Sequence, residues 1–147
     1  MTTPGEILHR YGIRPDKRRG QSFLTDLNTI HKIAAAGKIT GEDIVVEIGA
    51  GFGVLTKQIA RQAGRLIAVE IDLKLVEILR KELADFERVE IFSGNILKFD
   101  FSYISMQYKS RLKVVGNVPY NISSPVVFHL LAHRSAISEF TLMLQKE

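Results

Sequence analysis

The sequence predicts an α/β fold in which a mainly parallel sheet carries helices on both faces. Short apolar runs of the kind that form buried strands alternate with segments whose apolar residues recur at helical spacing. The first of these strands ends in a glycine-rich turn, and no repeat or low-complexity tract interrupts the alternation. Strict alternation is typical of parallel strands joined by crossover helices. We therefore expect residues 1–147 to form one α/β unit.

The individual elements follow from local signals. A helix is expected at residues 26–37, with Asp26 as its N-cap and Gly37 as its stop signal. The segment DIVVEIGAG, residues 43–51, is an apolar run ending in glycines, which suits a strand buried on both faces. The other expected elements are a helix at 52–64, a strand at 65–72, a helix at 73–85, strands at 88–95 and 109–117, a helix at 124–134 and a strand at 139–145.

Composition limits the class of protein. The chain is 46% hydrophobic and 24% charged, and no apolar run approaches the ~20 residues that span a membrane. Without cysteine, neither a disulfide framework nor a thiolate metal site can form. The first residues lack the apolar core of a secretory signal. We expect a cytoplasmic, monomeric protein with no membrane partner.

The net charge of +4 is concentrated near the N-terminus. Residues 1–20 hold five Lys or Arg against two acidic residues, which makes residues 1–25 a basic N-terminal segment. A polyanion is the simplest partner for such a cluster, and a solvated, flexible terminus is the alternative. Charge alone leaves both interpretations open.

A glycine-rich turn follows the first predicted strand. It reads EIGAGFG, with Glu47 followed by glycines at 49, 51 and 53. Ligands of such sheets bind at the carboxyl ends of the strands, although a plain strand-to-helix connection can also be glycine-rich. Glu70 ends the second predicted strand, where an acidic residue can accept hydrogen bonds from a ribose. Val54 stands where a dinucleotide fingerprint would need a third glycine, so the pattern favours a nucleoside cofactor other than NAD.

Five motifs occur in an order that resembles one family. They are GQSFL (20–24), VEIGAGFG (46–53), VEID (69–72), GNILKFDF (94–101) and GNVPYNISSP (116–125). Together they are similar to the ribosomal RNA adenine dimethyltransferases, and especially to the small-subunit members. The resemblance covers residues 10–147 and implies a Rossmann-like class I methyltransferase with sheet order 3-2-1-4-5, truncated after strand five.

The resemblance also implies a cofactor, S-adenosylmethionine. The residues expected to bind it are Gln21, Ser22, Leu24, Gly49, Gly51, Glu70, Ile71, Asn95, Ile96 and Asn117. Two of them depart from the family pattern. Ser22 stands where asparagine or histidine is common, and its hydroxyl reaches less far. Asn95 replaces an aspartate but keeps an oxygen acceptor for the cofactor's adenine amine.

The segment NVPY is expected to hold the target base. In the family, the asparagine side chain and the next carbonyl accept hydrogen bonds from the adenine N6 amine, which assigns Asn117 and Val118 to this role. Pro119 stiffens the turn and removes a competing N–H donor. Tyr120 is expected to stack on the flipped base. The expected reaction is dimethylation of adenine N6 in small-subunit ribosomal RNA.

The RNA partner follows from the same resemblance. Small-subunit ribosomal RNA or a pre-ribosomal particle would be contacted by the basic segment, through Arg14, Lys17, Arg18 and Arg19. Since the chain stops after strand five, we expect weak or absent turnover on ribosomal particles. Two alternatives remain: a large-subunit methyltransferase of the antibiotic-resistance type, and a non-catalytic nucleic-acid-binding factor on the same fold.

Three further patterns favour ordinary structural roles. His129 and His133 lie four residues apart on one predicted helix, but no third ligand is evident and we expect no metal site. Asn121 begins a glycosylation-like triplet inside the predicted active-site loop, which we interpret as coincidence. The aromatic residues Phe99, Phe101 and Tyr103 are expected to pack rather than to stack on bases.

Overall fold

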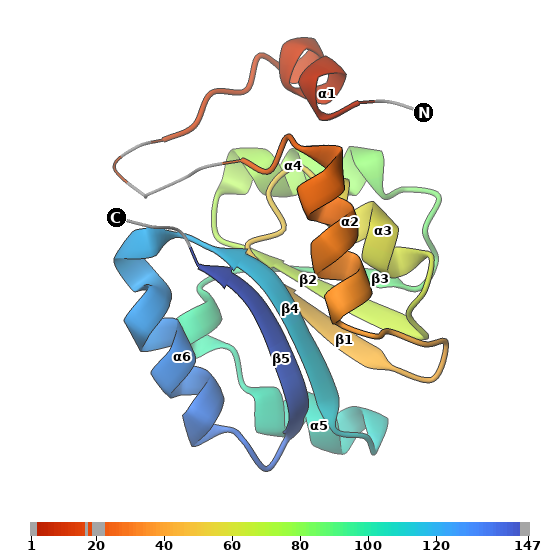
Figure 1. The fold of residues 1–147 in the computed structure, drawn as a ribbon, viewed down its shortest axis with the longest axis vertical. Coiled ribbons are helices and arrows are strands. Elements are labelled where there is room, and N and C mark those ends of the chain that lie inside the picture. Colours follow the sequence, from red (N-terminus) through yellow and green to blue (C-terminus); the bar gives the residue numbers. More distant parts are fainter. Residues whose placement is uncertain (1–2, 17, 19–22, 145–147) are drawn as a thin grey trace.

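The computed structural model describes residues 3–16, 18 and 23–144 (Figure 1). Five parallel strands form the central sheet in the order β3-β2-β1-β4-β5, which confirms the predicted fold class and strand order. The strands are β1 (Ile44–Ile48), β2 (Arg65–Glu70), β3 (Val89–Ser93), β4 (Leu112–Val118) and β5 (Ile137–Leu144). Strand order reverses between β1 and β4, so a ligand crevice is expected where these two strands end.

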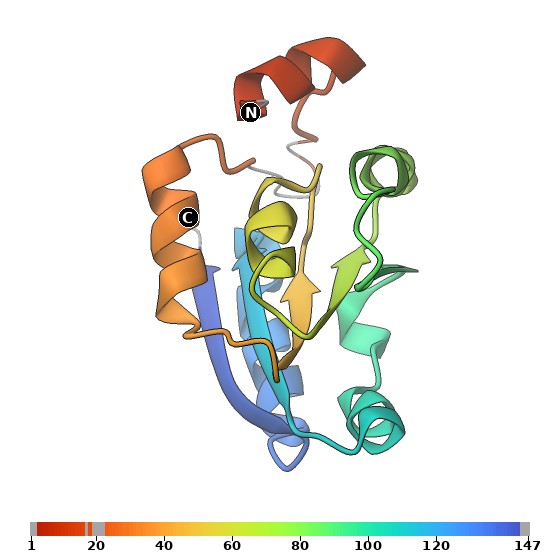
Figure 2. The same cartoon turned by 90° about the vertical axis from the view of Figure 1, so that its right-hand side faces the viewer.

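Helices cover both faces of the sheet (Figures 1 and 2). Apolar contacts place α2, α3 and α4 against one face and α5 and α6 against the other. A further helix, α1, lies beyond the carboxyl ends of the strands (Figure 1). The α-helices are α1 (Pro4–Tyr11), α2 (Leu27–Ala36), α3 (Val54–Ala60), α4 (Leu73–Glu82), α5 (Phe101–Tyr108) and α6 (Ser123–Ala132), and the short 3-10 helices are η2 (Ile96–Lys98) and η3 (Tyr120–Ile122).

The core has two layers because successive side chains of a strand point to opposite faces. On β1, Val45 packs with Ile30 of α2 and Ile59 of α3. Its neighbour Val46 packs on the other face with Phe101 at the start of α5. All five of these side chains are fully buried. This burial on both faces explains why β1 is apolar at every position except Glu47.

The centre of the sheet needs a glycine where β1 and β4 meet. A Cβ atom at Gly116 would lie 2.6 Å from the carbonyl oxygen of Ile48 and 2.8 Å from its Cβ. Any side chain there would push the two strands apart. Gly116 therefore keeps the ends of β1 and β4 close together, and these ends position the candidate site.

Two α-helices, besides the short 3-10 helices η2 and η3, were not predicted from the sequence. Helix α1 begins with a capping box between Thr3 and Glu6, inside the segment that was interpreted only by its charge. It is anchored by Ile7, which is 1% exposed, and by Tyr11, whose hydroxyl donates to Glu82 of α4 at 2.7 Å. Part of the basic N-terminal segment is thus a docked helix rather than a flexible tail.

Helix α5 was the second helix missed. Asp100 caps it by accepting a hydrogen bond from the Tyr103 backbone N–H at 3.0 Å. Phe99 and Phe101 are buried in contact with each other, which confirms their predicted packing role. For Tyr103 the packing prediction was wrong, because its side chain is 64% exposed on the outer side of the helix.

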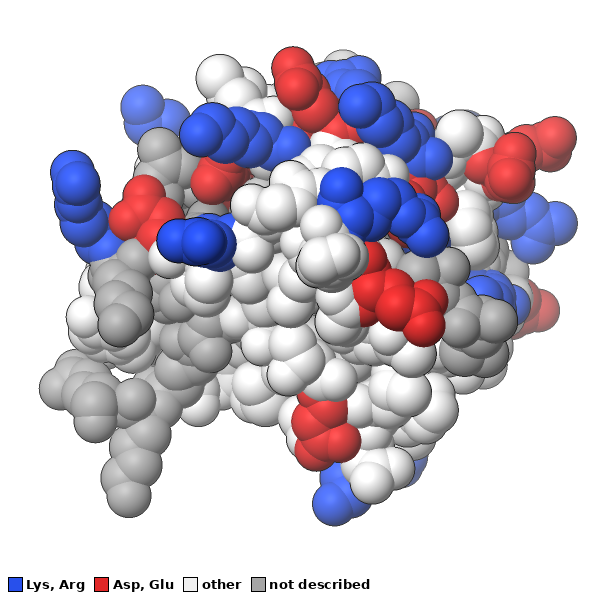
Figure 3. All heavy atoms as spheres, turned by 90° about the horizontal axis from the view of Figure 1, so that it is seen from above, with Lys and Arg blue, Asp and Glu red and all other residues white. Residues whose placement is uncertain are grey.

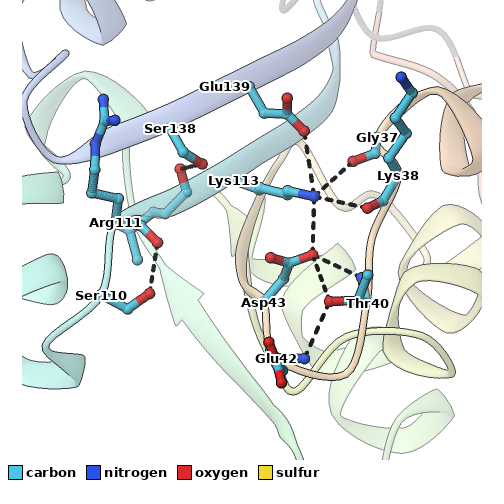
Figure 4. A network of polar contacts seen from close by, with 11 residues as sticks. Gly37, Lys38, Thr40, Glu42, Asp43, Ser110, Arg111, Lys113, Ser138 and Glu139 are labelled. Atoms are coloured by element: carbon cyan, nitrogen blue, oxygen red, sulfur yellow. Dashed lines mark hydrogen bonds and ion pairs between the residues drawn. The ribbon is translucent and has the colours of Figure 1, made fainter.

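At the amino ends of the strands, Lys113 of β4 ties three segments together (Figure 4). Its Nζ donates to the carbonyl oxygens of Lys38 at 2.8 Å and Gly37 at 3.3 Å. It also forms ion pairs with Asp43 at 3.0 Å and with Glu139 of β5 at 3.4 Å. The loop between α2 and β1 is thereby fixed to β4 and β5.

Replacing Lys113 with methionine is expected to destabilise the fold by about 2 kcal/mol, because it leaves a partly buried carboxylate and two carbonyls without their cation. Burial alone would raise the pKa of Asp43, but the Thr40 backbone N–H and the Lys113 charge outweigh it, and the net shift is downward. The ionised Asp43 therefore stabilises the fold fully above pH 3.8, which is the ordinary pKa of this group. This stabilisation is lost as the pH falls through the lower pKa that Asp43 has in the folded protein.

Chemical denaturation at neutral and acidic pH measures this effect. The difference in the free energy of unfolding between wild type and Lys113→Met should become smaller at acidic pH. As a matched control, Glu139→Gln removes a partner that is 51% exposed and should cost under about 1 kcal/mol. Equal stability of wild type and Lys113→Met at neutral pH would contradict the role assigned to this network.

Candidate functional site

A cavity of about 410 Å³ lies at the carboxyl ends of β1, β2 and β4, within the size range of small-molecule sites. All eight described residues that were predicted to bind a cofactor line it. These are Leu24, Gly49, Gly51, Glu70, Ile71, Asn95, Ile96 and Asn117. The other two, Gln21 and Ser22, lie outside the described residues. Segments far apart in the sequence are therefore gathered around one space.

The glycine turn after β1 forms one wall of the cavity. Gly49 and Gly51 have φ of +68° and +62°, in the left-handed region that favours glycine. A Cβ atom at Gly49 would lie 2.9 Å from the backbone carbonyl oxygen of Asn117. The absence of a side chain at Gly49 thus lets the turn lie directly against the end of β4. The predicted cofactor and target-base segments consequently share one wall.

Glu70, at the end of β2, braces this turn. Its side chain is 6% exposed; Oε1 accepts a hydrogen bond from the Gly51 N–H at 2.8 Å, and Oε2 accepts one from the Asp72 N–H at 2.9 Å. Burial raises the pKa of this carboxyl, while the two N–H donors oppose the rise. Each carboxylate oxygen has a second lone pair. Glu70 can therefore hold the turn and still accept hydrogen bonds from vicinal hydroxyls.

Asn95 lies just after β3 and also lines the cavity. Its Oδ1 accepts a hydrogen bond from the Leu97 N–H at 2.9 Å and so caps η2. An amide oxygen has two lone pairs, so one remains for a ligand amine. From the sequence, this oxygen was predicted only to accept a hydrogen bond from the ligand. In the structure it also fixes the backbone next to Ile96.

Only two of the four residues of the NVPY segment line the cavity. Asn117 and Pro119 line it, whereas the Val118 side chain is fully buried in the core below. Tyr120 begins η3 and is 43% exposed, outside the cavity lining. A buried valine between two cavity residues anchors the segment, and the tyrosine ring remains accessible from the surface.

Of the four residues predicted to bind RNA, two are described. Arg18 lines the cavity and Arg14 is exposed, while Lys17 and Arg19 lie outside the described residues. Figure 3 looks onto the end of the molecule where α1 lies, and shows Lys and Arg interspersed with Asp and Glu around an uncharged centre. The described part of this face therefore has mixed charge rather than one continuous basic patch.

Phe23, Phe52 and Glu47 are among the cavity residues that had no predicted role. Phe23 and Phe52 meet edge to face with ring centroids 5.2 Å apart, and α1 packs against the same apolar cluster. Glu47 of β1 also lines the cavity although it is only 1% exposed. Glu47 could have been predicted as a site residue, because a glutamate inside an otherwise apolar strand is unusual. The pair of Phe23 and Phe52 could not, because it depends on a contact between residues far apart in the sequence.

The two histidines of α6 have local partners. His129 Nε2 lies 2.9 Å from the carbonyl oxygen of Phe99, and His133 Nδ1 lies 2.9 Å from that of His129. Within the described ranges, no three His, Cys, Asp or Glu side chains are grouped to hold a metal ion. A search of the same residues finds no helix with the length and apolar character needed to cross a membrane.

The sheet order, the crossover helices and the cavity at the switch point define a Rossmann-like methyltransferase fold. Residues 14–147 match the model of the ribosomal RNA adenine dimethylase family, and the chain belongs to that family. This confirms the resemblance inferred from the five motifs.

Individual relatives agree with the family assignment. The chain is 43% identical over its whole length to ribosomal RNA small subunit methyltransferase A of Syntrophus aciditrophicus, of which it covers 53%. A solved dimethyladenosine transferase from Plasmodium falciparum is 31% identical with a TM-score of 0.73, covering 85% of this chain and 44% of that protein. The 23S rRNA methyltransferase ErmE is 28% identical with a TM-score of 0.69, covering 82% and 45%. The chain spans about half the length of the curated relatives it matches.

Proposed function

We propose that this chain binds S-adenosylmethionine and forms the methyl-transferring part of an adenine N6-dimethyltransferase that acts on small-subunit ribosomal RNA. The observation that carries this proposal is the shared wall, where Gly49 lies against the backbone of Asn117. A methyl donor bound along the glycine turn would be next to an adenine held by NVPY. Holding two reactants together in this way is a main source of catalysis.

The chemistry of the cavity fits the cofactor. S-adenosylmethionine supplies an electrophilic methyl group on a positively charged sulfonium. Glu70 would accept hydrogen bonds from its ribose hydroxyls, and Ile71 offers a half-exposed apolar surface for the adenine. The described lining contains two carboxyl groups, Glu47 and Glu70, and a single guanidinium, Arg18. A single guanidinium offers little compensation for the negative charges of a pyrophosphate.

The acceptor side supports transfer to an exocyclic amine. The N6 lone pair of adenine is delocalised into the ring, so attack on a methyl group requires the nitrogen to pyramidalise. The Asn117 side-chain oxygen and the Val118 carbonyl would accept hydrogen bonds from the amine and favour this change. Stacking on Tyr120 would contribute about 1–3 kcal/mol to holding the flipped base. Once methylated, the nitrogen loses its proton readily, so no strong base is required.

The remaining assignments belong to the same proposal. Residues 1–147 constitute the cofactor-binding domain, and the basic segment 1–25 contacts RNA phosphates through Arg14, Lys17, Arg18 and Arg19. The protein acts as a monomer in the cytoplasm, and its partner is small-subunit ribosomal RNA or a pre-ribosomal particle. The small subunit is favoured over the large because the relative that is 43% identical is named for it.

Two measurements test the proposal. Calorimetry should detect S-adenosylmethionine binding to this chain. A chimera in which residues 1–147 replace the matching segment of the Syntrophus aciditrophicus relative should transfer labelled methyl groups to bare small-subunit particles, at adenines that mass spectrometry can map. Modification of large-subunit RNA instead would favour the ErmE-like alternative. Cofactor binding without transfer to either RNA would favour a non-catalytic factor.

A further inference from the structure

Helix α1 is docked against the outer side of the cavity wall. Ile7 and Tyr11 are four residues apart and lie on the same side of this helix, where Ile7 is 1% exposed. Ile7 packs with Phe52 and Leu75, and Phe23 is packed against the same cluster. Phe23, Phe52 and Leu75 also line the cavity. The same three side chains thus form part of the cavity wall and the surface on which α1 lies.

The polar part of this contact is made by Glu82, the last residue of α4. Its Oε2 accepts a hydrogen bond from the Tyr11 hydroxyl at 2.7 Å, and its Oε1 accepts one from Lys57 Nζ of α3 at 2.8 Å. Arg10 of α1 adds an ion pair at 3.5 Å, and the Glu82 side chain is 8% exposed. Burial alone would raise the pKa of Glu82, but the hydrogen bonds from Lys57 and Tyr11 outweigh it, and the net shift is downward. Glu82 is therefore charged at neutral pH and ties α1 to both α3 and α4.

Helix α4 gives α1 two points of attachment. Leu75 and Glu82 are seven residues apart and so lie on the same side of α4, one in the apolar cluster and the other at the polar contact. Helix α1 has only 8 residues, and isolated helices of this length are marginal in water. Its position therefore depends on these contacts. Loss of the polar contact would weaken the packing of Ile7 on Phe52 and Leu75, which are also part of the cavity wall.

We propose that Tyr11 and Glu82 are positioning residues, which keep α1 docked and thereby hold the apolar wall of the cavity in the arrangement that binds the cofactor. This inference rests on the proposed S-adenosylmethionine site and adds to it two residues outside its lining. Molecules with α1 docked bind with full affinity, so the apparent affinity falls in proportion to the docked fraction. By linkage, the bound cofactor in turn favours the docked helix.

Calorimetric titration of Tyr11→Phe with S-adenosylmethionine provides the test. The variant removes only the hydroxyl that donates to Glu82, and its affinity should fall by about fivefold or more, the lower end of the coupling seen between two sites. Tyr108→Phe is the matched control, because the Tyr108 hydroxyl donates to Glu90 at the same distance of 2.7 Å and neither residue lines the cavity. This control should bind as wild type does. Wild-type affinity in folded Tyr11→Phe, or an equal loss in both tyrosine variants, would overturn the inference.

Two variants of Glu82 separate positioning from a general loss of stability. Glu82→Ala should weaken cofactor binding at least as much as Tyr11→Phe does. Glu82→Gln keeps an acceptor oxygen for the Tyr11 hydroxyl and should recover part of the affinity that alanine loses. If glutamine recovers none of it, the role assigned to the contact between Tyr11 and Glu82 is wrong.

Hydrogen exchange of the wild type provides a measurement that needs no variant. Exchange at the backbone amides of residues 7–11 should slow when S-adenosylmethionine binds, and by more than exchange in α5, which packs on the other face of the sheet. Exchange in α1 that the bound cofactor leaves unchanged would overturn the inference but not the proposed function. Absence of cofactor binding by the wild type would refute the proposed function as well.

Discussion

Replacing Glu70 with alanine is expected to weaken S-adenosylmethionine binding by about 10²- to 10³-fold. The variant removes the acceptor proposed for the ribose hydroxyls and leaves the N–H groups of Gly51 and Asp72 without their partner. Hydrogen bonds to a charged group contribute about 1.5–3 kcal/mol each, and about 1.4 kcal/mol corresponds to a tenfold change in affinity. Two such interactions at the lower end of this range amount to about 3–4 kcal/mol, which gives the expected magnitude. Calorimetric titration of this chain measures it directly.

The controls separate binding from folding. Glu70→Gln keeps one carbonyl oxygen and nearly the same volume, so its affinity should fall between wild type and alanine. Glu77→Ala removes an exposed glutamate of α4 and should bind as wild type does. Thermal unfolding of each variant identifies any general loss of structure. If Glu70→Ala binds within about threefold of wild type while remaining folded, the role proposed for Glu70 is wrong.

Replacing Asn117 with alanine is expected to lower the rate of methyl transfer by the chimera by about 10²- to 10³-fold, the scale seen when one positioned transition-state hydrogen bond is removed. Its side-chain oxygen is the proposed acceptor that helps the N6 amine to pyramidalise. Asn117 also lines the cavity, so we expect a smaller loss of cofactor affinity, of up to about tenfold. Single-turnover transfer with saturating cofactor separates the two effects.

Two variants provide the comparison for Asn117. Asn117→Asp retains an acceptor oxygen and should recover part of the transfer rate that alanine loses. Asn28→Ala removes an exposed amide at the start of α2 and should transfer methyl groups as wild type does. The proposed role is contradicted if Asn117→Ala lowers only cofactor affinity, because the residue would then bind the donor without acting on the acceptor.

Glu70 and Gly49 act together in a way that neither motif predicts alone. Glu70 fixes the turn through the Gly51 N–H, and the turn lies against the Asn117 carbonyl through Gly49. A displacement at the proposed ribose end is therefore passed through short, stiff backbone contacts to the proposed base-binding end. This connection is why Glu70→Ala should also reduce methyl transfer at saturating cofactor.

The secondary structure was predicted best where local pattern and burial agree. Strands β1, β2 and β4 have predominantly apolar sequences because helices cover both of their faces, and their existence and order were predicted correctly. Asp26 was recognised as the N-cap of α2, where its side chain accepts from the Asn28 N–H at 3.0 Å. Caps and apolar periodicity are local in sequence, so they can be read without the fold.

The two missed helices show where local information is too weak. Helix α1 has 8 residues and depends on Ile7 packing onto Phe52 and on the Tyr11 contact with Glu82, 71 positions away. Isolated helices of this length are marginal in water. Helix α5 is equally short and is anchored by Phe101 under the sheet. Both helices are stabilised by contacts that no local window contains.

The sequence by itself determined the fold class, the family and the residues of the two proposed half-sites, because glycine turns, strand ends and NVPY are local patterns. The tertiary structure alone decided how these halves meet. Parallel pairing of β1 with β2 and β4 aligns their carboxyl ends, which places the Glu70 carboxylate on the Gly51 N–H and brings Gly49 against the Asn117 backbone. The same packing buries Glu47 beside Glu70 and raises its pKa, an effect that depends on solvent exclusion and on the distance between charges rather than on residue order.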